Sequence, residues 1–203
     1  MRQLLRDIKQ SIKFARWRMR GRPGTPPSIA KRHTLARYAK EFGVLVFVET
    51  GTHRCETTWF LRRHFRELHT IEVEPAKVAA AKRLCEGQAH IHVYEGDSGK
   101  VLPQVLAKLT EPALFWLDGH YMDAHSGDPN NKTPASAELL AVLRHAVKNH
   151  VIVIDDASLF NGRDGYPSMD ELLAVVKRER PDLHVLVAHN SIRLTTRPAH
   201  VVV

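Results

Sequence analysis

The chain of 203 residues is long enough for one well-packed domain and short for two. Its hydrophobic fraction of 43% and charged fraction of 26% are ordinary for a globular protein and argue against wholesale disorder. No stretch approaches the ~20 consecutive apolar residues of a membrane span, and no apolar signal region follows the charged N-terminus, which predicts a cytoplasmic protein. The two cysteines, Cys55 and Cys85, form neither a metal-ligand pattern nor a disulfide framework.

The net charge of +8 is concentrated at the N-terminus. Residues 1–22 carry eight lysines and arginines against one acid, Asp7, which leaves about +1 for the other 181 residues. Proteins that follow a phosphate backbone usually spread basic side chains over the folded surface. The charge therefore predicts a basic arm and argues against a nucleic-acid partner.

Residues 1–20 have the pattern of an amphipathic helix. Apolar residues recur at three- and four-residue steps beside a stripe of basic residues, and the Pro- and Gly-rich segment 21–27 ends the helix. The apolar stripe comprises Leu4, Ile8, Ile12, Ala15 and Met19. Two interpretations stay open: the stripe packs on the domain or on a second subunit of a homodimer, or the helix lies on an anionic membrane surface at the inner face of the membrane. Residues 1–27 are thus predicted to be an arm and linker, and residues 28–203 the folded domain.

After a predicted helix over Ser28–Phe42, strands and helices alternate along the chain. The predicted strands are 44–48, 68–73, 91–94, 113–117, 151–154, 183–187 and 192–195, and the predicted helices between them are 57–65, 75–84, 101–109, 134–148 and 168–178. This alternation predicts an α/β fold with a doubly wound, mostly parallel sheet. Only residues 188–191 join the last two strands, too few for a crossover helix, so these strands should form a C-terminal antiparallel hairpin.

Ligands of such sheets bind beyond the carboxyl ends of the strands, so the residues after each strand are the candidate site. Glu49, Gly51 and Thr52 follow the first strand, and the glycine lets the backbone turn tightly against a ligand. A dinucleotide fold needs further glycines around a pyrophosphate, whereas here only Gly51 fits and Glu49 and Glu56 would repel that group. The segment favours S-adenosylmethionine (SAM), a nucleoside cofactor that carries an ammonium and a sulfonium but no phosphate.

Acids also follow the next two strands. Glu72 ends the second strand, about 20 residues after the first, where its carboxylate can accept hydrogen bonds from both hydroxyls of a ribose. The third strand is followed by Gly96, Asp97 and Ser98, where the acid can read an adenine amino group. The alternative is that Glu49 and Asp97 are helix-capping acids. Three acids at three successive strand ends favour the cofactor interpretation.

A second group of acids follows the fourth and fifth strands. Asp118 ends the fourth strand, and Asp155 and Asp156 end the fifth. If these strands are neighbours, ~4.8 Å apart, the three carboxylates converge and repel one another unless they are protonated or neutralised. A hard divalent cation such as Mg²⁺ resolves this repulsion. The alternative is that one or two of the acids cap helices or face solvent.

Five segments together resemble the class I SAM-dependent methyltransferases. They are Glu49-Thr50-Gly51-Thr52, Thr70-Ile71-Glu72, Gly96-Asp97-Ser98, Leu117-Asp118-Gly119-His120 and Ile154-Asp155-Asp156. The chain is similar, over roughly residues 28–200, to the metal-dependent O-methyltransferases that include the macrocin-type sugar enzymes and the catechol and caffeoyl-CoA enzymes. This resemblance implies a seven-stranded Rossmann-like fold, methyl transfer to a hydroxyl, and a Mg²⁺ ion held by Asp118, Asp155 and Asp156.

Two residues depart from the family pattern. Cys55 stands where most relatives have a second glycine, which is expected to reshape the cofactor loop or lower its affinity; a space-filling role is favoured over that of an acidic thiol. His120 stands where the sugar-modifying relatives often have an aspartate that acts as general base, and a histidine can do the same work. Its alternatives are a partner of the metal ligands or an inert polar residue. His125, in the polar loop 119–133, is a second candidate for the base.

The sequence thus predicts a SAM- and Mg²⁺-dependent O-methyltransferase that acts on a hydroxyl of a sugar, a glycan or a glycosylated metabolite. His120 and Asp118 are its predicted catalytic residues. The alternatives are a metal-independent enzyme, a non-catalytic protein with the same fold and, with less support, an RNA methyltransferase.

Overall fold

The computed structural model describes residues 2–21, 25–119 and 133–201, and the side chains of the first helix from Lys9 onward. Two helices, α1 (Arg2–Met19) and α2 (Ser28–Phe42), precede the first strand. The strands are β1 (Val46–Thr50), β2 (Glu67–Glu72), β3 (Ile91–Glu95), β4 (Ala113–Leu117), β5 (Val151–Ile154), β6 (His184–Ala188) and β7 (Ser191–Thr195). The remaining helices are α3 (Glu56–Leu61), α4 (Pro75–Leu84), α5 (Ser98–Leu106), α6 (Ala135–Arg144), the short 3-10 turn η1 (Ala157–Leu159) and α7 (Met169–Glu179).

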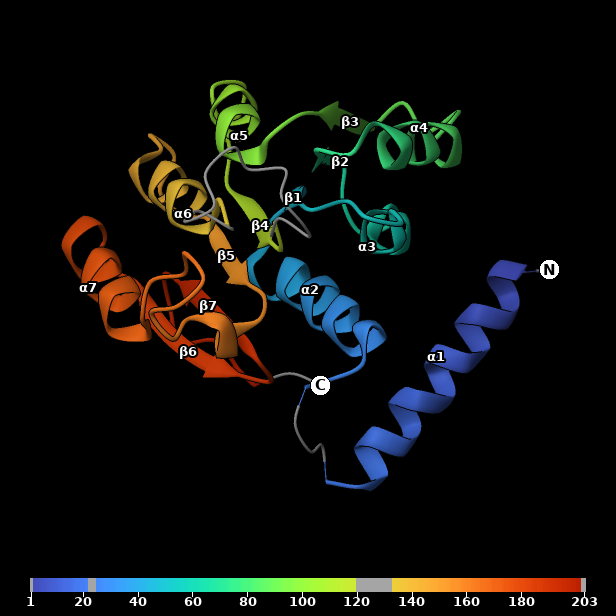
Figure 1. The fold of residues 1–203 in the computed structure, drawn as a ribbon, viewed down its shortest axis with the longest axis horizontal. Helices are drawn as coiled ribbons and strands as arrows, with labels where there is room; N and C mark the ends of the chain where they lie inside the picture. Colours follow the sequence, from blue (N-terminus) through green and yellow to red (C-terminus); the bar gives the residue numbers. More distant parts are fainter. Residues whose placement is uncertain (1, 22–24, 120–132, 202–203) are drawn as a thin grey trace.

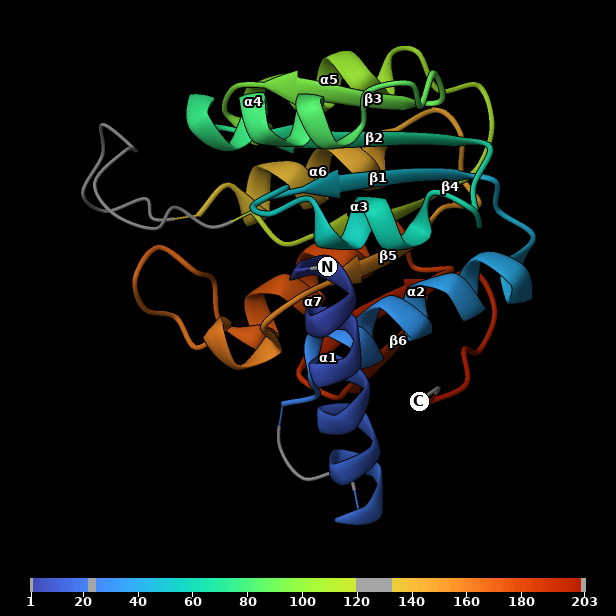
Figure 2. The ribbon, with the colours of Figure 1, turned by 90° about the vertical axis from the view of Figure 1, so that its right-hand side faces the viewer.

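The strands form one seven-stranded sheet in the order β3-β2-β1-β4-β5-β7-β6 (Figure 1). The pairs from β3 to β5 are parallel, whereas β7 runs antiparallel to both β5 and β6. The predicted fold class, with its doubly wound parallel sheet and C-terminal hairpin, is confirmed. In Figure 2 the arrowheads of the parallel strands point to one edge of the sheet, where the carboxyl ends of β1, β4 and β5 meet.

Several element boundaries differ from the prediction. The first strand begins at Val46 rather than residue 44, and Leu45, which precedes it, is half exposed. Helix α5 begins three residues early, since the Asp97 carboxylate accepts a hydrogen bond from the Gly99 amide at 2.9 Å and caps the helix. Helices α3 and α6 each end four residues before their predicted ends.

Two apolar layers cover the sheet, one on each face. Alternate residues of a strand point to opposite faces, so Phe47 and Trp116 pack toward α2, α3 and α4, whereas Val48 and Phe115 pack toward α5 and α6. Both faces of the central strands are therefore buried, which explains their uninterrupted apolar sequence.

Helix α1 packs against α2 outside the sheet (Figure 1). Its contact residues are Phe14, stacked on His33 with ring centres 5.6 Å apart, and Trp17, whose ring lies edge-on to His189. Ile12 and Met19, which belong to the predicted apolar stripe, are 47% and 77% exposed. The helix thus docks through aromatic residues outside that stripe. Among the described residues no helix has the length and apolar character needed to cross a membrane.

Candidate functional site

A cavity of about 420 Å³ lies at the carboxyl ends of β1, β4 and β5. Its volume falls in the range of about 300–1,000 Å³ that is typical of small-molecule sites. Its walls come from the segment after β1, from the acids after β4 and β5, and from the two N-terminal helices. The lining residues include Gln10, Lys31, Arg32, Leu35, Glu49, Gly51, Thr52, Glu56, Trp116, Asp118, Asp155 and Asp156.

Gly51 allows the segment after β1 to pass close to the end of β4. Its φ of +81° lies in the left-handed region, and a Cβ atom there would lie 2.5 Å from the backbone oxygen of Asp118. The amides of Gly51 and Thr52 both donate to the Ile71 carbonyl, at 3.0 and 3.2 Å. Only glycine fits this position, because a side chain would force the two strand ends apart.

Glu49 places a buried carboxylate in the cavity wall. Its side chain is 2% exposed, and its Oε2 accepts hydrogen bonds from the hydroxyls of Thr58 (2.6 Å) and Thr70 (2.9 Å). Burial raises the pKa of Glu49 to about 7, although these hydrogen bonds act in the opposite direction. The N-cap position of α3 belongs to Cys55, and Glu49 contacts this helix through the Thr58 hydroxyl. A positively charged group in the cavity would favour its ionised form.

The other predicted cofactor residues do not line this cavity. The Glu72 carboxylate accepts hydrogen bonds from the backbone amides of His53 (2.7 Å), Val73 and Glu74 (both 3.0 Å). Asp97 is the N-cap of α5, as its alternative interpretation held. Of the seven predicted residues, Glu49, Gly51 and Thr52 face the cavity, and Glu72, Gly96, Asp97 and Ser98 are not among its lining residues.

The three acids after β4 and β5 come together. Leu117 and Ile154 are register partners at the ends of these adjacent parallel strands, and one carboxylate oxygen from each of Asp118, Asp155 and Asp156 lies within 4.8 Å of the others. Burial raises the pKa of Asp118 well above its usual range, and the neighbouring Asp155 raises it further. Asp118 and Asp155 therefore need a positive charge nearby to stay ionised.

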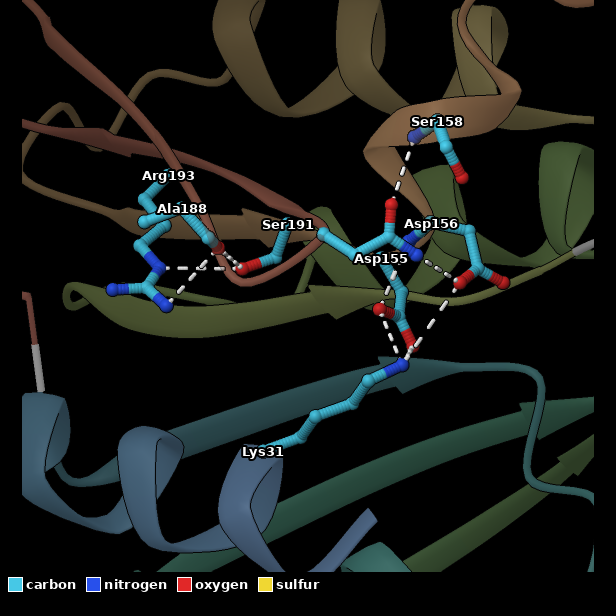
Figure 3. A network of polar contacts seen from close by, with 8 residues as sticks. Lys31, Asp155, Asp156, Ser158, Ala188, Ser191 and Arg193 are labelled. Atoms are coloured by element: carbon cyan, nitrogen blue, oxygen red, sulfur yellow. Dashed lines mark hydrogen bonds and ion pairs between the residues drawn. The ribbon is translucent and has the colours of Figure 1, made fainter. Parts of the chain in front are cut away.

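Lys31 supplies that charge in the structure (Figure 3). Its Nζ lies 2.7 and 2.5 Å from the two carboxylate oxygens of Asp155 and 3.9 Å from Oδ1 of Asp156. Lys31 is not among the residues predicted from the sequence, because it comes from α2 rather than from a strand end. Its position four residues before the buried Leu35, on the same side of the helix, is the available signal.

The donor set of the three aspartates fits a hard divalent cation. Three carboxylates face one ammonium, so negative charge remains in excess, and oxygen is the ligand that Mg²⁺ prefers. The Lys31 ammonium contacts both carboxylate oxygens of Asp155, so a metal ion that binds Asp155 has to displace this ammonium.

A second cation from α2 also faces the cavity. The guanidinium of Arg32, which is 7% exposed, lies 2.5 Å from Oε2 of Glu56. Because Arg32 neutralises Glu56, only Glu49 would still repel a pyrophosphate at this site. The segment after β1 also lacks the further glycines that a dinucleotide-binding loop needs.

Cys55 adopts the conformation of the glycine that it replaces. Its φ is +57°, its side chain is 1% exposed, and its Sγ lies 3.6 Å from that of Cys85. The hydrogen bond with Cys85 and burial raise the pKa of the Cys55 thiol, so it fills space in the core and is not an acidic thiol. His120 and His125 lie outside the described residues.

Solved structures with a similar fold include three methyltransferases. PaMTH1 from Podospora anserina, with S-adenosylhomocysteine (SAH) bound, matches with a TM-score of 0.60 at 15% identity over 83% of this chain and 78% of that one. The O-methyltransferase TomG from Streptomyces achromogenes, involved in tomaymycin synthesis and solved with SAM, has a TM-score of 0.56 at 18% identity over 93% and 89%. An O-methyltransferase from Bacillus cereus, in complex with SAH, has a TM-score of 0.55 at 17% identity over 81% and 80%.

No family model matches the sequence, and no curated protein matches it either. The similarity is therefore one of fold, and it covers most of the length of both chains in each pair. Together with the strand order, it shows that the chain has the fold of the class I SAM-dependent methyltransferases.

Proposed function

We propose that the protein is a SAM- and Mg²⁺-dependent O-methyltransferase that acts on a hydroxyl of a sugar, a glycan or a glycosylated metabolite. The observation that carries this proposal is a single cavity that is lined both by Gly51 and Glu49 and by three convergent aspartates. The fold supports the cofactor, and the resemblance to sugar-modifying enzymes supports the acceptor.

The wall formed by Gly51 and Glu49 suits a cationic nucleoside. Gly51 lets the segment after β1 pack against the end of β4 and still line the cavity, and the Glu49 carboxylate offers a buried negative charge to the ammonium or sulfonium of the cofactor. Glu72, Gly96, Asp97 and Ser98 stay predicted contacts of the ribose and adenine.

In the same cavity, Asp118, Asp155 and Asp156 would hold the metal ion and with it the acceptor. When bound, SAM supplies an electrophilic methyl group and Mg²⁺ lowers the pKa of the acceptor hydroxyl. The aspartates fix the direction of the acceptor oxygen, and this positioning lowers the entropic barrier. His120 is proposed to accept the hydroxyl proton, and Asp118, two residues before it in the sequence, is proposed as both metal ligand and catalytic residue.

The first experiment is a calorimetric titration of the full chain with SAM and SAH, with and without Mg²⁺. We expect SAM and SAH each to bind at one molecule per chain. Release of SAH is then measured with a panel of simple glycosides and with catechol, in Mg²⁺ and in EDTA. Asp155→Ala should abolish turnover, whereas Asp170→Ala, at an exposed acid of α7, should leave it unchanged. Absence of SAM and SAH binding would reject the proposal in favour of a non-catalytic protein.

A metal-independent methyltransferase is the second candidate, and the ion pair between Lys31 and Asp155 is the observation that favours it. If the ammonium stays in place during turnover, the aspartates orient the acceptor without a metal. Turnover that persists in EDTA would select this candidate.

The partner of the exposed apolar residues of α1 also stays a prediction. Ile12 and Met19 point away from the body of the protein, beside the basic side chains of the same helix. Sedimentation with vesicles that contain phosphatidylserine tests contact with the cytoplasmic membrane face, and light scattering tests a homodimer.

A further inference from the structure

A cluster of two histidines and one glutamate lies at the opposite end of β2 and β3 from the cavity. His69 of β2 and His92 of β3 are register partners in adjacent parallel strands, so their side chains leave the sheet on the same face. Glu67 precedes His69 by two residues and shares that face. These residues belong neither to the cavity nor to the proposed reaction.

The three side chains converge on one point. Oε1 of Glu67 lies 3.3 Å from Nε2 of His69 and 3.2 Å from Nε2 of His92. One ligand atom from each residue lies within 4.8 Å of the others. The two imidazole rings stack with their centres 5.0 Å apart, which points both rings the same way.

His69 is held with one ring nitrogen free. Its side chain is 3% exposed, and its Nε2 is buried without a hydrogen bond among the described residues. The hydroxyl of Tyr94 lies 3.1 Å from Nδ1 of the same ring. When Nδ1–H donates to this hydroxyl, the lone pair of Nε2 faces Glu67 and His92, which is the arrangement that supporting hydrogen bonds give to metal-binding histidines.

Charge and access also suit a cation. Burial lowers the pKa of His69 to about 4, so the imidazole is neutral at pH 7. The side chains of Glu67 and His92 are each 41% exposed, which leaves an open approach from solvent. The Nζ of Lys108 lies 5.6 Å from the centre of the Tyr94 ring, and its positive charge opposes the binding of a cation at this cluster.

We propose that Glu67, His69 and His92 form a site for a transition-metal dication, most suitably Zn²⁺. Two imidazole nitrogens and one carboxylate oxygen make a three-ligand set that leaves a fourth position for water. Zinc–nitrogen bonds of about 2.0–2.1 Å place the ligand atoms roughly 3.3 Å apart. The Glu67 oxygen already lies at 3.3 and 3.2 Å from the two nitrogens, and the exposed side chain of His92 can adjust its distance from His69. The ion would join the edge strand β3 to β2.

The test is titration of the full, chelator-treated chain with Co²⁺, followed by visible absorption, and with Zn²⁺, followed by calorimetry. We expect one nitrogen-ligated Co²⁺ per chain, identified by its d–d bands and separate from any Co²⁺ at the three aspartates, and a higher Tm in Zn²⁺. His92→Gln and Glu67→Gln, both at half-exposed positions, should each weaken binding at least tenfold and remove the Tm shift.

Two controls separate this site from other ligands. His90→Gln removes a neighbouring imidazole outside the cluster, and Asp155→Asn disables the aspartate site; both should keep the d–d bands of the nitrogen-ligated Co²⁺ at the intensity of the unmodified chain. Absence of these bands from the unmodified chain, or equal bands in the folded His92→Gln and Glu67→Gln variants, would overturn the proposal. Either result leaves the methyltransferase proposal untouched, because that proposal is tested by SAM binding and turnover.

Discussion

Replacing Lys31 with methionine tests how the aspartates are neutralised. The ammonium lies 2.5–2.7 Å from both oxygens of Asp155, and the two side chains are 17% and 5% exposed. Methionine keeps most of the side-chain volume and removes the charge. Without added metal, we expect Lys31→Met to lower the Tm, because it leaves a buried carboxylate unpaired.

The same substitution should strengthen metal binding. Unit charges ~4 Å apart interact by about 4 kcal/mol at an effective dielectric constant of about 20. Lys31 recovers part of this energy when it swings into water, so we expect a gain of about 1.5–3 kcal/mol, which is about ten- to a hundredfold in Kd. Mg²⁺ should then restore the lost Tm.

Binding is measured with Mn²⁺ by electron paramagnetic resonance, and with Mg²⁺ by calorimetry. Lys40→Met, at an exposed lysine of the same helix, is the matched control and should change neither the Kd nor the Tm. An Mn²⁺ affinity of Lys31→Met equal to that of the unmodified chain would refute the reasoning, because the ammonium would then not compete for Asp155.

Three further predictions concern other parts of the chain. Gly51→Ala should lower the free energy of unfolding by about 1–3 kcal/mol and weaken SAH binding, because the new Cβ meets the backbone oxygen of Asp118. The control Gly87→Ala has a similar φ but open space around its Cβ, so its free energy of unfolding should fall less and its SAH affinity should not change. Chemical denaturation measures the first quantity and calorimetry the second. Burial raises the pKa of Glu49 to about 7, so the folded state binds more protons than the unfolded state between about pH 4.5 and 7. The ligand-free protein should therefore lose stability as the pH rises through this range. Glu49→Gln should flatten that part of the curve of Tm against pH, and an unchanged slope would contradict the raised pKa of Glu49. Trp17→Ala should speed proteolysis of residues 20–27 because α1 loses its buried anchor, whereas the exposed Met19→Ala should not, as followed by gel electrophoresis over time.

The fold was predictable because its strands are uninterrupted apolar runs separated by helices. That pattern survives small errors at the boundaries, such as the two-residue shift of β1. The meeting of Asp118 with Asp155 was predictable too, since parallel strands end at a common edge.

What the sequence could not give is the position of the helices across the sheet. Lys31 reaches Asp155 over 124 residues of sequence, and no local spacing encodes that contact. The face of α1 that docks on the rest of the chain was not predictable for a related reason. The periodicity favoured the aliphatic stripe, whereas Phe14 and Trp17 bury larger rings against partners that only the tertiary structure defines.

The position of Gln10 and Lys31 in the cavity wall has a practical consequence. Recombinant versions trimmed to the Rossmann-like core, with the first strand as their starting point, would lose one side of the binding chamber and expose Asp155 to solvent. Affinity tags therefore belong at the C-terminus, and inhibitor screens should retain every residue that precedes β1.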